Sequence, residues 1–285
     1  SRVSYMNNNV GQNWRTYDMK GEWLRVQDGL IPRTGGAGGQ GVDYIESYWL
    51  NEQRARYVRD RDTFGANPYF LTYHDDDPGP KQNFSYMGGA TGNLLDMIYN
   101  GYDGPSRAEI ESITRFCAQS CLLFVGGNGE APAGGRTGDH VWNDVVYGNT
   151  FELAAEMAWA DGDARLAGQY RRAARLAFQS AWRYQQEQGW FSVTKNLLPA
   201  AHALGLGTVL ANYNGYTEIH SSEAFATELA PIPEAPAPSE IGGYAVTLDD
   251  QFDTTFANAG GMQVQMCTEG SMAANVTGNL RWHTL

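Results

Sequence analysis

Charged side chains are scarce in this chain: Asp, Glu, Lys and Arg make up 18% of its 285 residues. Apolar residues reach 42% and aromatic residues 12%, so the chain can build a core and disorder is not expected. Only three cysteines are present, which excludes a scaffold stapled by disulfides. The sequence has no run of about 18 apolar residues and therefore predicts no membrane-spanning segment.

The charges that are present are mostly acidic. Asp and Glu number 32 against 20 Lys and Arg, which gives a formal net charge of −12 at pH 7. This balance argues against nucleic acid as a partner. A polyanionic substrate would need a local basic cleft within the acidic surface. The first half of the chain offers candidates for such a cleft: Arg15, Arg25, Arg33, Arg54, Arg56, Arg59, Arg61, Lys81 and Arg136.

Apolar residues recur at helical spacing through most of the chain up to residue 229. We expect helices at about residues 14–26, 43–58, 85–100, 106–124, 141–159 and 164–188, and a shorter pair at about 197–210 and 222–229. Ser106 with Glu109 three residues later predicts a capping box at one of these starts. Polar or glycine-rich loops, with no expected strands, separate the helices, which favours a layer of helical hairpins.

The pattern changes at residue 230. Residues 230–240 contain four prolines and indicate a stiff linker. Residues 241–285 alternate and are rich in Thr, Val and Gly, which predicts three or four antiparallel strands. So few strands do not make a stable sheet alone, so they either pack on the helical body or continue in further sequence. We therefore expect a helical domain over residues 1–229, the linker, and the start of a β domain.

The segment NPYFLTYHDDDPGPKQNFSYMGGATGNLLDMIYNG carries the most informative chemistry. It places His74 and Tyr86 at the mouth of an expected helix. A His and a Tyr in this position can bind a sugar and move a proton. Small residues, which leave backbone room for a sugar ring, follow the tyrosine at Gly88, Gly89, Ala90 and Gly92.

This segment resembles the catalytic His/Tyr segment of the hyaluronate, chondroitin and xanthan lyases, a family of α/α-toroid polysaccharide lyases. The stretch GQNWRTYDMKGEW is similar to the family's Asn-Trp helix, with Asn13 and Trp14 at its start and Tyr17 after them. The stretch TGGAGGQGVDY resembles the loop that carries the family's catalytic asparagine, whose place Gln40 takes. Arg136, in GGRTGDH, stands where the family has its arginine.

The resemblance implies a mainly α protein: an incomplete α/α toroid followed by antiparallel β-sandwich strands. It implies a secreted or periplasmic lyase that cleaves a uronate-containing acidic polysaccharide by β-elimination without a cofactor. Amide and imidazole donors would stabilise the enolate, and the tyrosine would transfer the proton. The expected catalytic residues are His74, Tyr86, Arg136 and Gln40.

Two further clusters are candidates for sugar contacts. GDHVWNDVVYGN spaces His140, Asn143 and Tyr147 three and four residues apart, so they can share one helix face. NYNGYTEIHSSE holds Tyr216 and His220. The full set of expected substrate-binding residues is Asn13, Trp14, Tyr17, His140, Asn143, Tyr216 and His220.

Other functions remain open. An α/α-barrel glycoside hydrolase would use two carboxylates, such as Asp76 and Asp144. A non-catalytic glycan-binding or structural protein would fit the Gln40 replacement. Asp75, Asp76 and Asp77 lack the spacing of a calcium loop, so we interpret them as a solvated acidic turn and expect no metal. The few strands leave sheet edges unpaired, so we also expect the chain to continue in a longer polypeptide or to pack against another copy.

Overall fold

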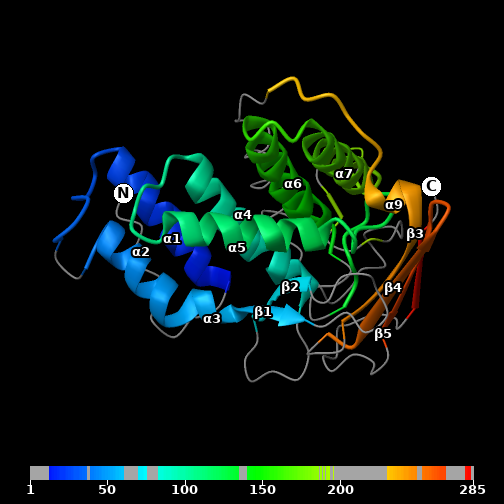
Figure 1. Ribbon diagram of the computed structural model, residues 1–285, viewed down its shortest axis with the longest axis horizontal. Helices are drawn as coiled ribbons and strands as arrows, with labels where there is room; N and C mark the ends of the chain where they lie inside the picture. Colours follow the sequence, from blue (N-terminus) through cyan, green and yellow to red (C-terminus); the bar gives the residue numbers. More distant parts are fainter. Residues whose placement is uncertain are drawn as a thin grey trace.

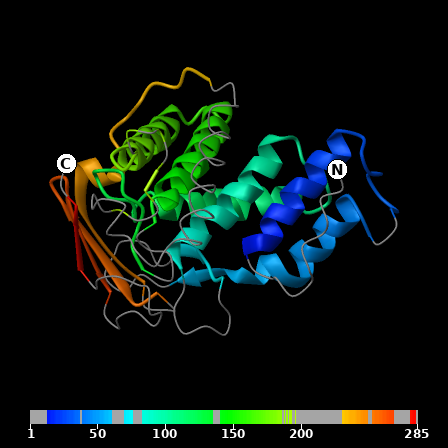
Figure 2. The same ribbon diagram turned by 180° about the vertical axis from the view of Figure 1, so that it is seen from behind.

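The computed structural model describes residues 13–36, 39–60, 70–75, 83–134, 140–185, 187, 189, 191–192, 195, 230–248, 252–267 and 280–283. These residues form a helical body with an antiparallel sheet at one side (Figures 1 and 2). The helices are α1 (Asn13–Gln27), α2 (Val42–Tyr48), the π-helical turn η1 (Trp49–Gln53), α3 (Arg54–Arg56), α4 (Phe84–Tyr99), α5 (Arg107–Cys121), α6 (Trp142–Ala160), α7 (Ala164–Trp182) and α9 (Pro238–Ile241). The strands are β1 (Tyr57–Asp60), β2 (Phe70–Tyr73), β3 (Gly242–Leu248), β4 (Thr254–Ala259), β5 (Met262–Cys267) and β6 (Leu280–His283).

Side-chain caps fix two of the helix starts. The side chain of Asn83 accepts a hydrogen bond from a backbone N–H at 2.9 Å and starts α4. Asp163 does the same for α7 at 3.0 Å. The predicted capping box at Ser106 is wrong, because the Ser106 hydroxyl donates to Glu46 at 2.5 Å and thereby ties α5 to α2.

Helices α1 and α4 lie side by side and run in the same direction. In the first turn of α1, the Thr16 hydroxyl accepts a hydrogen bond at 3.1 Å from the side chain of Asn93, which lies in the middle of α4. At their ends, the indole N–H of Trp23 donates to the carbonyl of Asn100 at 2.9 Å. The two helices are therefore parallel but staggered, because the first turn of α1 lies beside the middle of α4.

Helix α6 lies on the other side of α4 and is parallel to it as well. The Tyr147 hydroxyl donates to the carbonyl of Phe84 at 2.8 Å, and the Thr150 hydroxyl donates to the carbonyl of Gly88 at 3.0 Å. The three helices consequently point in the same direction, and the start of α1 is set back along the row relative to the starts of α4 and α6.

A second layer of helices returns beside the first (Figure 1). Helix α5 contacts α4 where the Thr91 hydroxyl donates to the Cys117 sulfur at 3.3 Å. Helix α7 contacts α6 through an ion pair of Arg171 with Glu152 at 2.7 Å. The pairs α1/α2, α4/α5 and α6/α7 are thus successive hairpins, and among the described residues they form a row rather than a closed ring.

A strand pair interrupts the helices, so the expectation of no strands in this half was wrong. β1 pairs antiparallel with β2, and Tyr57 stands opposite Tyr73. The helix expected to reach residue 58 ends at Arg56, and β2 lies in what was expected to be a polar loop. All four residues of β2, FLTY, are buried, and aromatic and β-branched residues favour such a strand.

The C-terminal strands form one antiparallel sheet in the order β3-β4-β5-β6, and this sheet packs on the helical body. The ring of Phe84 on α4 lies 4.5 Å from that of Phe252 and 5.5 Å from that of Phe256. Phe256 also stacks on Phe124, with centroids 5.1 Å apart. The Gln263 side chain donates to the Phe124 carbonyl at 3.0 Å. Sheet and helices therefore share one core.

The proline-rich segment 230–240 lies along α7. Arg172 of α7 contacts Glu240 at 2.6 Å, and Ala235 donates its N–H to the Gly168 carbonyl at 3.0 Å. A Cβ on Gly168 would stand 2.7 Å from a carbonyl oxygen of the segment, so only glycine permits this approach. Contacts along its length hold the linker to the helical body.

Candidate active site

The glycines that follow Tyr86 bring α6 against α4. A Cβ on Gly88 would lie 2.6 Å from the ring of Tyr147, and one on Gly92 would lie 2.6 Å from the Thr150 hydroxyl. At these two positions, the backbone room expected to receive a sugar is filled by α6. The glycines at these positions therefore let α6 pack closely against α4.

Four aromatic side chains gather where α1, α4 and α6 begin, and we call this set, Trp14, Tyr17, Tyr86 and Trp142, the aromatic end. Tyr86 on α4 stacks with Trp142 on α6, with ring centroids 6.3 Å apart and an interplanar angle of 27°. Trp14 and Tyr17 on α1 are 6.0 Å apart. The Tyr17 hydroxyl lies over α4, 3.9 Å from where a Cβ on Gly89 would stand. Trp14, Tyr17 and Tyr86 are half-buried, so each stays partly open to solvent.

His140 lies next to the aromatic end as a neutral imidazole. Its Nδ1 accepts a hydrogen bond from the indole N–H of Trp142 at 3.1 Å, which leaves the ring proton on Nε2. Burial, together with the positive charge of Lys195, lowers the pKa of His140 to about 4. At neutral pH the ring can therefore donate a hydrogen bond without carrying a charge.

Asp75 ties the end of β2, where His74 lies, to the start of α1. Its Oδ1 accepts from the backbone N–H of Asn13 at 2.6 Å and from the Asn13 side chain at 2.9 Å. Arg56 donates to the carbonyls of both His74 and Asp75, at 3.1 and 2.8 Å. His74 Nε2 lies 3.2 Å from the Thr72 hydroxyl. The interpretation of a solvated turn is wrong for Asp75, which is 1% exposed and caps a helix.

Asp144 has a structural role beneath the start of α6. It is fully buried, and its Oδ1 lies 2.7 Å from the Lys195 ammonium and accepts from the Ala131 N–H at 2.8 Å. Its Oδ2 accepts from the Ser180 hydroxyl at 2.7 Å. Burial raises the pKa of Asp144 despite the neighbouring ammonium. Both oxygens are engaged, so Asp144 does not fit the role of a hydrolytic carboxylate.

Asn143 and Tyr147 are placed less favourably for sugar binding than their spacing suggested. Both side chains are fully buried, and the Tyr147 hydroxyl is bonded to Phe84 of α4. Burial raises the pKa of Tyr147 well above its usual value, which also opposes a role in proton transfer. Of the three residues in that cluster, only His140 is partly exposed.

Gln40 lies at the opposite end of α1 from the aromatic end. The residue after it, Gly41, donates its N–H to Glu22 at 3.0 Å, in the second half of α1. A helix of fifteen residues is about 20 Å long. The structure therefore does not bring Gln40 together with Tyr86. Arg136, Tyr216 and His220 lie outside the described residues.

The arginines expected to form a basic cleft are largely neutralised. Five of them form ion pairs with nearby carboxylates: Arg15 with Asp18 at 3.3 Å, Arg25 with Glu22 at 3.0 Å, Arg33 with Asp103 at 2.6 Å, Arg54 with Glu109 at 3.0 Å, and Arg56 with Glu52 at 3.6 Å. These five therefore do not supply the expected cleft. At the aromatic end, the groups suited to an anion are the start of α6, which no side chain of the described residues caps, and neutral donors such as His140.

Sequence reasoning missed three residues of this region. Trp142 stands two positions after His140, and an aromatic residue beside a candidate histidine is a usable signal. Asp75 was assigned to solvent because it precedes two further aspartates. Lys195 gave no signal, since its partner is 51 positions away and only the fold brings them together.

Two kinds of feature are absent from the part of the chain that the structure describes. No group of three or more His, Cys, Asp or Glu side chains there could hold a metal ion. No helix there combines the length and the apolar composition needed to cross a membrane.

Fold and site together define a mainly helical protein with a C-terminal antiparallel sheet and an aromatic, hydrogen-bonding surface at the starts of three parallel helices. No family model matches the sequence, and no curated protein or solved structure is detectably similar to it. A functional assignment must therefore rest on the chemistry of the site.

Proposed function

We propose that this protein is a polysaccharide lyase that cleaves a uronate-containing acidic polysaccharide by β-elimination at the aromatic end. One observation supports the proposal. The first two turns of three parallel helices carry Trp14, Tyr17, Tyr86 and Trp142, and His140 is hydrogen-bonded to Trp142. Aromatic faces suit the apolar faces of sugar rings, and their polar edges bind hydroxyl groups.

The chemistry of β-elimination fits the polar groups at this end. The C5 proton of a uronate becomes acidic only when the adjacent carboxylate is neutralised, because removal of the proton creates an enolate. The start of α6 and the neutral His140 supply donors for that developing charge. Tyr86 takes the proton and returns one to the leaving oxygen. His74, held beside the start of α1 by Asp75, is the second imidazole donor.

The same proposal extends to the fold. The hairpins α1/α2, α4/α5 and α6/α7 are arranged like successive hairpins of an α/α toroid, with α1, α4 and α6 as the inner helices. In such a layer the inner helices all start on one rim, which is where a polymer would lie. A polysaccharide substrate also implies a secreted or periplasmic protein.

A non-catalytic glycan-binding role is the second candidate, and the position of Gln40 favours it. The amide that would stand in for the family's asparagine lies at the far end of α1. An aromatic end without that amide would still bind sugar rings while the barrier to proton removal stayed high.

The test is incubation of the protein with hyaluronan, chondroitin, xanthan and polygalacturonate. A lyase generates a C4–C5 double bond, which absorbs in the ultraviolet, whereas a hydrolase generates reducing ends without that absorbance. Ultraviolet absorbance that rises with time on at least one polymer is the expected result. Binding without turnover on every polymer would support the glycan-binding role, and neither binding nor turnover would overturn both.

A further inference from the structure

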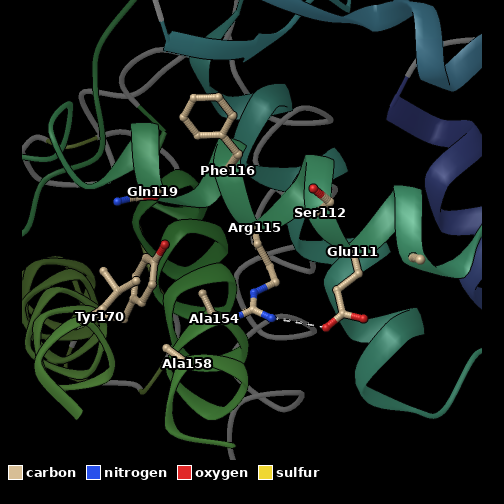
Figure 3. Close-up of a pocket in the computed structure, with 10 residues that line it drawn as sticks. Glu111, Ser112, Arg115, Phe116, Gln119, Ala154, Ala158 and Tyr170 are labelled. Carbon is tan, nitrogen blue, oxygen red and sulfur yellow. Dashed lines mark hydrogen bonds and ion pairs between the residues drawn. The ribbon is translucent and has the colours of Figure 1, made fainter. Parts of the chain in front are cut away.

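A groove of about 450 Å³ lies on the outer side of the helical body, between α5, α6 and α7 (Figure 3). Its α6 wall includes Ala154, which is twelve residues along the helix from Trp142, or about 18 Å. The groove is therefore separate from the aromatic end. Its volume falls within the range of about 300–1,000 Å³ that is typical of small-molecule sites.

The charged groups of the groove balance one another. Arg115 contacts Glu111 at 3.3 Å and also pairs with Asp161, and Figure 3 shows the Arg115 side chain reaching its contact with Glu111. Arg107 binds the other oxygen of Glu111 at 2.8 Å. Two guanidinium groups thus meet two carboxylates. An ion entering the groove would find no net charge to attract it.

The remaining lining combines aromatic surface with neutral hydrogen-bonding groups. Phe116 from α5 is half-buried and provides aromatic surface, while the buried Tyr170 of α7 and buried alanines of α6 complete the lining. Ser112 and Gln119 lie one above the other on α5, and both side chains are exposed. The groove therefore presents an apolar wall, a hydroxyl group and an amide group to a bound molecule.

We propose that this groove binds a neutral sugar ring. A pyranose has apolar C–H faces that lie against aromatic and alanine side chains, and it has hydroxyl groups around its edge. Those hydroxyls can donate to the Glu111 carboxylate and the Gln119 carbonyl, and they can accept from Ser112 and Arg115. A wholly apolar guest would form no hydrogen bonds with these groups, and an anion would gain no net attraction. This site stands apart from the proposed lyase reaction.

The test is a titration of the isotope-labelled protein with cellotetraose and maltotetraose, followed by backbone amide NMR. At least one of the two sugars is expected to shift amides of α5 and the start of α7. Ala108→Trp, a substitution at an exposed position of the groove, should weaken that binding at least tenfold. Gln119→Ala should weaken it several-fold, and tetragalacturonate should not shift these amides.

Matched substitutions outside the groove control for effects on folding. Ala55→Trp and Gln179→Ala replace exposed residues of the same types on α3 and α7 and should leave the affinity unchanged. The proposal is overturned if neither neutral sugar shifts α5, or if Ala108→Trp binds as well as Ala55→Trp. It is also overturned if only the aromatic, anionic dye 8-anilinonaphthalene-1-sulfonate occupies the groove. The assay involves no turnover, so its result does not depend on lyase activity.

Discussion

Replacement of Asp75 tests whether the start of α1 is held by a carboxylate from a distant part of the chain. Asp75 is 1% exposed, and one of its oxygens accepts both hydrogen bonds from Asn13. The backbone N–H of Asn13 is among the first N–H groups of α1, which have no partner within the helix. Asp75→Ala removes the only acceptor that the described residues give this N–H.

The expected loss of stability follows from two contributions. Replacement of a capping side chain by alanine costs about 0.5–2 kcal/mol. A buried amide left without an acceptor costs about 1–3 kcal/mol more. We therefore expect Asp75→Ala to lower the free energy of unfolding by about 1.5–5 kcal/mol. Asp75→Asn keeps one acceptor oxygen and should lose about half as much.

The effect on function should exceed the effect on stability. Trp14 and Tyr17 lie in the first two turns of α1, and His74 precedes Asp75 on the chain. Loss of this contact displaces Trp14 and Tyr17 relative to His74. In folded Asp75→Ala, the KM for the uronate polymer should therefore rise more than kcat falls.

The assay is urea unfolding followed by tryptophan fluorescence and circular dichroism, with turnover measured per folded molecule. Asp28→Ala is the control, because Asp28 is exposed and lies beyond the other end of α1. It should change stability by no more than about 0.5 kcal/mol. The reasoning is refuted if Asp75→Ala is as stable as Asp28→Ala, or if it binds the polymer as tightly as the wild type.

Other substitutions test the remaining parts of the account. Lys195→Met leaves the buried charge of Asp144 unpaired and should cost about 3–5 kcal/mol in urea unfolding, part of which is recovered by adding Asp144→Asn. The pKa of His140 is lowered from 6.5 to about 4, so the unfolded state binds an extra proton between these pH values and the wild type loses stability as the pH falls. His140→Gln lacks this group, so its free energy of unfolding relative to wild type should rise by about 3 kcal/mol from pH 7 to pH 4. Burial raises the pKa of Glu152 from 4.5 to about 7, so the native state binds the extra proton there, and Glu152→Gln should show the opposite trend of about 3 kcal/mol. If the stability of both variants relative to wild type changed in the same direction as the pH falls, these two pKa assignments would be contradicted. Gln40→Ala should leave turnover of a uronate polymer within about twofold, since the side chain lies far from Tyr86, and a hundredfold loss would contradict that placement.

The regular helices were the most predictable part of the fold. In α4 the periodic run Leu94, Leu95, Met97 and Ile98 is buried as expected, and the helix begins within a residue of its expected start. The predictions of secondary structure failed where one local sequence pattern is compatible with both a helix and a strand. Helix α3 ends at Arg56 because Tyr57 and the residues after it pair with β2. This pairing joins residues that are distant in the sequence, so helical periodicity does not reveal it.

The candidate site was less predictable, because its members are joined by the packing of helices. Spacing alone placed Tyr86 near a helix start, and the structure puts it there. Spacing did not reveal that Tyr147 fills the space above Gly88, or that Asp75 reaches back 62 residues to Asn13. Whether a side chain faces a cleft or the core depends on which helices become neighbours.

The most direct test of the central claim is the turnover of Tyr86→Phe on a uronate polymer, measured by the ultraviolet absorbance of the unsaturated product. The substitution removes one hydroxyl and keeps the ring that stacks on Trp142. If Tyr86 transfers the proton, turnover should fall by about 10²–10⁴-fold, while polymer binding and the melting temperature stay close to those of the wild type. Tyr99→Phe, at the other end of α4, should keep full turnover. Full turnover in Tyr86→Phe would contradict the proposed role of the aromatic end.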